Sequence, residues 1–177
     1  DTKMGTCETL TLEENLALGL TRGKNRGLGP ALKSAKTEIL KEQVASLGLG
    51  LENRLRDKIG LLSGGQRQAL SLLMATLQPI DILLLDEHTA ALDPKTAKFV
   101  LNLTAEIVAA DKLTVLMVTH SMQQALAYGQ RTLMLHEGEV IFDIEGPERA
   151  KLKVADLLRL FEQKRGEVLS DDGLLLS

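Results

Sequence analysis

The chain has 177 residues, 44% hydrophobic and 25% charged, which is ordinary for a single soluble globular domain. A formal net charge of −3 gives no general reason to expect nucleic acid or an anionic membrane as a partner. A single cysteine, Cys7, excludes an internal disulfide, and no apolar run reaches the 18 residues typical of a membrane span.

The first predicted helix begins after Thr11. Thr11 and Glu14 have the spacing of a capping box, in which each side chain bonds the other residue's backbone N–H. Leu12, Leu16 and Leu20 then recur on one face over two turns. The pattern predicts an amphipathic helix with this face in the core.

A basic, glycine-rich connection over 21–30 leads to a second predicted helix over 33–47. The connection is interpreted first as a solvated surface loop, and second as a contact to a partner or to lipid headgroups. The apolar stripe of the second helix comprises Ile39, Leu40, Val44 and Leu47.

The stretch 61–77 predicts a helix with an anion-binding start. Ser63 and Gln66 form a second capping box, and Gly64 and Gly65 leave backbone N–H groups bare at the positive end of the helix. The apolar face comprises Leu70, Leu73, Met74 and Leu77. Taken alone, the motif is more typical of an ordinary capped surface helix.

A short apolar run over 82–85 predicts a strand that is buried on both faces. It ends in two adjacent acids, Asp86 and Glu87. Two desolvated carboxylates are costly unless they bind something, so we expect a divalent cation on Asp86 and a water or nucleophile on Glu87. The alternative is that the acids mark the exposed end of the strand.

The next helix is predicted to begin with Asp93 as N-cap and Pro94 at its first position. Its core stripe comprises Ala97, Val100, Leu101, Thr104 and Val108. A buried strand over 113–118 follows and leads to His120. Ligands of open parallel sheets sit at the carboxyl ends of the strands, so the acids and His120 are consistent with one shared site, although a lone histidine there is most often structural.

The remaining chain predicts a helix, a hairpin and a final helix. Ser121 and Gln124 form a third capping box, and Gly129 suits the helix end. Strands over 131–136 and 139–143 surround a tight turn, with His136 interpreted as a strand residue only. The last helix, from Pro147 onward, has a stripe of Val154, Leu157, Leu158 and Phe161, and a loosely held tail is expected over 170–177.

Four motifs in order, LSGGQRQ, LLLLDE, AALD and VTH, resemble the nucleotide-binding subunit of ATP-binding cassette (ABC) transporters. MGTCETLTLEENLALGLTRGK and DEHTAALDPKTA resemble importers described as tryptophan/tyrosine transport systems. The resemblance implies an α/β fold, the C-terminal part of an ABC-type RecA-like P-loop ATPase core with the ABC α-helical subdomain. It places the helical subdomain at 1–77, the partial core at 78–145 and a C-terminal helical extension at 146–177.

The resemblance also implies the chemistry. In ATP hydrolysis coupled to transport, Asp86 would hold Mg²⁺, Glu87 would polarise the attacking water and His120 would contact the γ-phosphate. The residues implied to serve the ATP of a second, head-to-tail subunit are Ser63, Gly64, Gly65 and Gln66, with Asp93 lining the dimer seam. The implied partners are that subunit, transmembrane permease subunits and a substrate-binding protein, at the cytoplasmic face of the membrane, with no nucleic acid.

The chain departs from the family pattern in two ways. No GxxxxGK[ST] phosphate-binding loop occurs in it, and the opening DTKMGT resembles the stretch that follows the family's Q-loop glutamine. We therefore expect a C-terminal fragment that is a poor ATPase by itself and that associates with another chain or aggregates. His88 stands where many members have proline, and no chemistry is assigned to it.

Two alternatives remain open at this point. One is the head lobe of an SMC- or repair-type ABC ATPase, which also carries a signature and an Asp-Glu pair, but no heptad-bearing segment leads into the signature here. The other is a non-catalytic module that lends its signature face to a partner.

Overall fold

The computed structural model describes residues 5–22 and 34–163, without the side chains of 34–36, in two units, 1–117 and 118–177. Most of the predicted basic connection and the whole of the predicted tail lie outside the described residues. Each unit is considered by itself. The domain boundaries at 77 and 145 stay a prediction.

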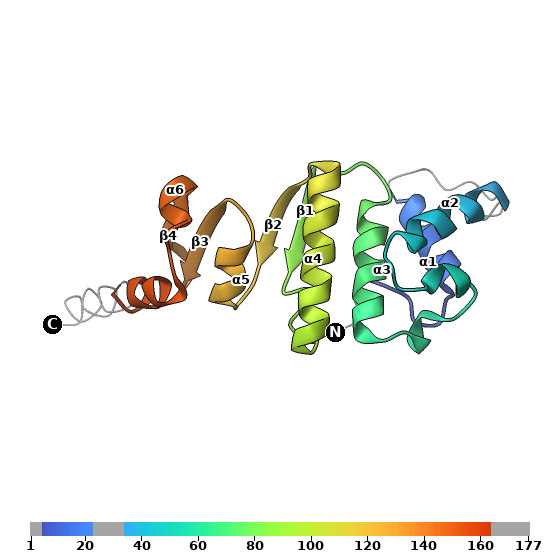
Figure 1. Cartoon of the computed structure of the whole chain (residues 1–177), viewed down its shortest axis with the longest axis horizontal. Helices are drawn as coiled ribbons and strands as arrows, with labels where there is room; N and C mark the ends of the chain where they lie inside the picture. Colours follow the sequence, from blue (N-terminus) through green and yellow to red (C-terminus); the bar gives the residue numbers. More distant parts are fainter. Residues whose placement is uncertain (1–4, 23–33, 164–177) are drawn as a thin grey trace. The chain divides into compact units, whose positions relative to one another are not determined.

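The first unit combines helices with a two-stranded sheet (Figure 1). Its helices are α1 (Leu12–Leu20), α2 (Ser34–Ala45), α3 (Gly64–Thr76) and α4 (Pro94–Asp111), with short 3-10 helices η1 (Leu51–Asn53) and η2 (Ile59–Leu61). Its strands are β1 (Ile82–Asp86) and β2 (Thr114–Val118). None of the described helices is long and apolar enough to cross a membrane.

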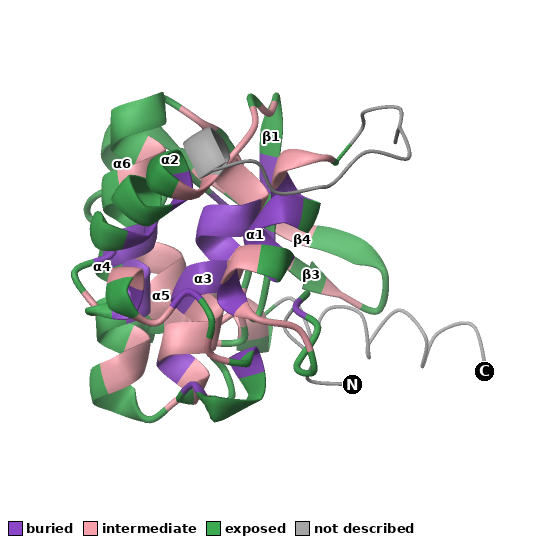
Figure 2. Ribbon diagram, turned by 90° about the vertical axis from the view of Figure 1, so that its right-hand side faces the viewer, coloured by how far each residue is buried: buried purple, intermediate pink, exposed green. Residues whose placement is uncertain are grey.

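The core of this unit forms where α1, α2 and α3 pack together, and Figure 2 shows buried residues gathered on α1 and α3. Its fully buried members are Leu12, Leu16, Leu40, Val44, Leu51, Ile59, Ala69 and Leu70. The predicted capping boxes at Thr11 and Ser63 are confirmed. Both helices therefore begin where the sequence indicates, with their apolar faces inward.

The stripe predicted for α2 is wrong at one position. Leu40, Val44 and Leu47 are buried, whereas the side chain of Ile39 is 57% exposed. The three buried residues recur at i, i+4 and i+7, so they occupy one face, and Ile39 lies about 100° away from Leu40 around the helix. One residue of offset is enough to turn an apolar side chain to solvent.

The prediction of strands buried on both faces is also wrong. Strands β1 and β2 are hydrogen-bonded neighbours joined by α4. In β1, Leu83 and Leu85 are buried, but Leu84 is 65% exposed. Ile82 and, on β2, Leu116 are exposed as well. Successive strand side chains point to opposite faces, and the face that carries Leu84 is left uncovered by the described chain.

Helix α4 begins as predicted, with Asp93 as N-cap and Pro94 in the first turn. The Asp93 carboxylate accepts hydrogen bonds from the backbone N–H groups of Lys95 and Thr96, each at 3.1 Å. Hydrogen bonds from Thr96 hold the pKa of Asp93 below its ordinary value. Of the predicted stripe, Val100, Leu101 and Thr104 are buried and Ala97 and Val108 are partly buried.

The second unit contains α5 (Met122–Ala127), β3 (Arg131–His136), β4 (Glu139–Glu145) and α6 (Gly146–Arg149), and its helical structure resumes over 154–163. The predicted hairpin is confirmed, with positive φ at Glu137 and Gly138 and a register shift between Met134 and Leu135. Of the last predicted stripe, Leu157 is fully buried, whereas Val154 and Leu158 are exposed.

The third capping box forms only in part. Ser121 accepts a hydrogen bond from the Gln124 N–H, as expected, but the Gln124 side chain accepts from the hydroxyl of Thr119 instead of from the Ser121 backbone. The Ser121 N–H donates to Thr119 Oγ1 at 3.1 Å. Thr119, which precedes the helix, therefore takes the place of the Gln124 side chain as the acceptor for the Ser121 N–H. Gly129 has φ +76°, as suits a residue just past a helix end.

Arg149 links three elements of the second unit by hydrogen bonds. Its guanidinium is buried and donates to Thr132 Oγ1 and, from one terminal nitrogen, to the carbonyls of Ala125, Leu126 and Tyr128 at 2.9, 3.2 and 2.6 Å. These carbonyls lie at the C-terminal end of α5, where a cation is favoured by the helix dipole. Arg149 therefore ties α6 to the end of α5 and the start of β3.

We expect Arg149→Met to lower the free energy of unfolding of this unit by about 2–3 kcal/mol, because charge-assisted bonds are lost and three partly buried carbonyls lose their donor. Urea denaturation of the 177-residue chain measures the change. The control is Arg159→Met, since the Arg159 side chain is 69% exposed and pairs at the surface with Asp156. Equal midpoints for the two variants would contradict this role of Arg149.

Candidate functional site

The signature turn, formed by the LSGGQRQ motif (62–68) at the start of α3, has the geometry of a capped helix. Ser63 Oγ accepts from the Gln66 N–H at 3.3 Å, and Gln66 Oε1 accepts from the Ser63 N–H at 3.1 Å. The first amides of a helix have no carbonyl one turn earlier to bond. Ser63 is exposed, so this end of α3 is open to solvent and suited to an anion.

The two signature glycines approach the segment that leads into α4. A Cβ added to Gly64 would lie 3.2 Å from Leu92 Cδ2, and one added to Gly65 would lie 2.2 Å from Thr96 Cγ2. The second distance is far below any real contact of a Cβ. The absence of a side chain at Gly65 is therefore what allows α3 and α4 to pack this closely, and it brings the signature next to the turn capped by Asp93.

The acids lie where the sequence places them. Strand β1 ends at Asp86, and Glu87 follows with φ +42°, a left-handed conformation that is uncommon for a residue with a side chain. The Glu87 carbonyl accepts from the Ala90 N–H at 2.9 Å, which closes a turn directly after the strand. Both acids are exposed, which agrees with the alternative that they mark the open end of the strand.

A pocket of about 430 Å³ borders this turn. Its lining combines the side of α3 that carries Gln68 and Ser71 with β1 and the turn after it, including Asp86 and Glu87. The acids therefore border a hollow that the signature helix also lines. Within the first unit the structure brings the signature helix, the acid pair and the α4 cap into one neighbourhood.

The acids at this edge suit a metal ion that a nucleotide helps to bind, but not one held by protein side chains alone. The described residues contain no group of three or more His, Cys, Asp or Glu that could hold a metal ion by itself. Mg²⁺, however, is commonly bound through one or two carboxylates, with waters and substrate phosphates completing its shell. The exposed Asp86 fits that second mode, in which the nucleotide supplies part of the shell.

His88 makes a contact that the sequence did not predict. Its Nε2 lies 3.4 Å from Oγ1 of Thr104, and the Thr104 side chain is buried on α4. Burial lowers the pKa of His88 below its ordinary value. An unusual residue directly after the acids was the one sequence signal that pointed to it.

His120 lies in the second unit, two residues after the end of β2, and its side chain is exposed. The residue before it, Thr119, is held by its bonds to Ser121 and Gln124. The acids and His120 thus follow two paired strands, as expected. Because they fall in different units, their sharing of one site stays a prediction.

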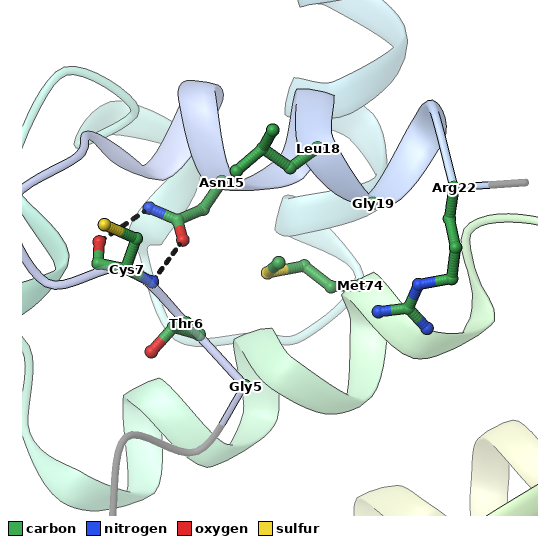
Figure 3. Close-up of a pocket in the computed structure, with 8 residues that line it drawn as sticks. All are labelled: Gly5, Thr6, Cys7, Asn15, Leu18, Gly19, Arg22 and Met74. Carbon is green, nitrogen blue, oxygen red and sulfur yellow. Dashed lines mark hydrogen bonds between the residues drawn. The ribbon is translucent and has the colours of Figure 1, made fainter. Parts of the chain in front are cut away.

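A second pocket, of about 330 Å³, lies in the helical part of the first unit (Figure 3). The buried Asn15 shapes its wall, since its side chain bonds both the N–H and the carbonyl of Cys7, at 2.8 and 3.0 Å. Gly19, Arg22 and Met74 form other parts of the lining. None of the predicted site residues borders this pocket.

Three elements together define the α/β fold of an ATP-binding cassette. They are a helix that begins with Ser-Gly-Gly-Gln, a strand that ends in Asp-Glu, and an Asp-capped helix that packs on the first helix. The family model described as ABC transporter matches residues 3–90. A tyrosine transport ATP-binding protein from Clostridioides difficile is 47% identical over 162 residues, 92% of this chain and 64% of that protein. The chain belongs to the ABC transporter family.

Other similar proteins are ATP-binding cassettes as well. The thiamine import ATP-binding protein ThiQ of Yersinia pestis is 39% identical over 140 residues, covering 78% of this chain and 58% of that protein. A dimeric ATP-binding cassette solved in a post-hydrolysis state with ADP and inorganic phosphate has a TM-score of 0.62 and 30% identity, covering 81% of this chain and 60% of its own. The chain thus spans about six-tenths of the length of each of these three proteins.

Proposed function

We propose that the chain is part of the ATP-binding subunit of an ABC importer, in which ATP hydrolysis drives transport. The likeness to ATP-binding proteins of tyrosine and thiamine transport supports the importer assignment. The observation that carries the proposal is the pocket bordered by the signature helix α3 on one side and by Asp86 and Glu87 on the other. The partner subunits would choose the transported compound.

The proposed chemistry is an in-line attack of water on the γ-phosphate of ATP. Asp86 would hold Mg²⁺, directly or through water, and Mg²⁺ would neutralise charge on the phosphates. Glu87 would accept a proton from the attacking water, and its exposed carboxylate is open to solvent as that role requires. His120 would contact the γ-phosphate and orient it.

The proposed site is composite. Ser63, Gly64, Gly65 and Gln66 would bind the ATP held by a second subunit, because their helix start is open to solvent. Asp93 would line the seam between the subunits. The dimeric cassette among the structural neighbours supports such an arrangement. Transmembrane permease subunits, a substrate-binding protein and a place at the cytoplasmic face of the membrane complete the proposal.

ATP-driven pairing tests the composite site. The experiment uses an extended chain, in which a segment with a phosphate-binding loop precedes residues 1–177, carrying Glu87→Gln so that ATP is not consumed. We expect Mg²⁺-ATP to double its mass in light scattering, because each ATP would be held between two subunits.

Adding Ser63→Arg should prevent this doubling, because a long side chain would block the signature turn. The control is Ser46→Arg, at an exposed serine just after α2. A mass that stays monomeric with Mg²⁺-ATP, or that doubles in spite of Ser63→Arg, would contradict the composite site.

A further inference from the structure

We propose that His88 is a positioning residue, which holds the backbone of Glu87 in its functional conformation through a hydrogen bond to Thr104 of α4. The inference rests on the proposed function, because it assumes that Glu87 acts on the attacking water. It adds a residue for which the sequence indicated no chemistry.

The contact joins two parts of the chain that are 16 residues apart. His88 Nε2 and Thr104 Oγ1 are separated by 3.4 Å, and Thr104 is 6% exposed in the middle of α4. Helix α4 itself is held by its Asp93 cap and by its buried residues Val100 and Leu101. Thr104 is therefore a rigid point to which the turn after β1 can attach.

The hydrogen bonds of Thr104 determine the direction of this contact. A threonine hydroxyl has one hydrogen to donate, and Thr104 donates it to the carbonyl of Val100 at 2.8 Å. Its oxygen can then only accept from His88, which requires a hydrogen on Nε2 of the imidazole. The half-buried ring is thereby held in one orientation and one tautomer.

Glu87 needs such an anchor because of its backbone conformation. A residue with φ +42° and a side chain relaxes to negative φ unless its neighbours prevent it. On one side Leu85 is buried in the core, and on the other Thr89 is buried with 6% exposure. The bond from His88 to α4 holds the residue directly after Glu87, so the carboxylate is presented from a turn anchored at both ends.

Five variants of the extended chain test the role. His88→Leu and Thr104→Val remove the bond from either side, and we expect each to lower kcat for Mg²⁺-ATP about tenfold or more with little change in KM, because the water-polarising group is misplaced. The double variant should be no worse than either single one. The controls are His88→Gln, which keeps an N–H donor, and Thr104→Ser, which keeps the hydroxyl; both should retain most of the turnover.

A second readout does not depend on activity. Long-range ¹H–¹⁵N NMR of the 177-residue chain should show neutral His88 protonated on Nε2 alone, and Thr104→Val should return the ring to the mixture of tautomers of a free imidazole. A ring protonated on Nδ1 in the unaltered chain would overturn the proposal. Turnover absent from every extended chain would overturn the proposed function, whereas normal turnover in the unaltered chain and unchanged kcat in His88→Leu and Thr104→Val would overturn only the role of His88.

Discussion

Glu87→Gln in the extended chain is expected to lower Mg²⁺-ATP turnover by about 10³-fold, the size of effect that general-base catalysis supplies. The amide has nearly the same shape as the carboxylate but cannot accept a proton from water. ATP affinity should change little, because Asp86 and not Glu87 is proposed as the metal ligand. Steady-state hydrolysis together with nucleotide binding by fluorescence separates the two effects.

The chain offers a matched control for this experiment. Glu137 is also an exposed glutamate with positive φ, 49°, but it lies in the turn between β3 and β4. Glu137→Gln should leave turnover unchanged. Turnover of Glu87→Gln close to that of Glu137→Gln would show that another group activates the water.

Gly65→Ala is expected to lower the free energy of unfolding by about 1–3 kcal/mol, the usual cost of forcing a methyl group into a packed contact. The new Cβ would lie 2.2 Å from Thr96 Cγ2, so the Thr96 side chain or one of the two helices must move. We also expect turnover of the extended chain to fall, because the signature turn moves with α3. Thermal and urea unfolding of the 177-residue chain measure the first effect.

Two further variants test whether the clash with Thr96 causes the loss of stability in Gly65→Ala. Adding Thr96→Ser to Gly65→Ala removes the clashing methyl group while keeping the hydroxyl, and should restore much of the lost stability. Gly60→Ala is the control, because its Cβ would meet atoms only at ordinary distances, 3.4 Å from the Glu8 carbonyl, and its φ is not positive. Equal losses from Gly60→Ala and Gly65→Ala would contradict the close approach.

The local features of the fold could be predicted from the sequence. The caps at Thr11, Ser63 and Asp93 and the turn at Glu137 depend on residues at most three positions apart, so the chain itself carries the information. The same holds for the place of the acids at the end of β1. These predictions are confirmed because short-range hydrogen bonds decide them.

The errors arose where partners distant in sequence decide the outcome. An apolar run such as 82–85 predicts a strand, but not which faces are covered, and Leu84 proved exposed. The contacts of Gly65 with Thr96, of His88 with Thr104 and of Arg149 with α5 each join positions 16 to 31 residues apart. No spacing rule within a single element predicts such pairs.

Mg²⁺-ATP turnover by residues 1–177, measured beside the extended chain and its Glu87→Gln variant, tests the composite site and the role of Glu87 together. We expect turnover only in the unaltered extended chain, because the described pocket supplies the acids and the signature helix but the 177 residues contain no phosphate-binding loop. Comparable turnover by 1–177 alone, undiminished by Glu87→Gln, would contradict both the site and the role of Glu87.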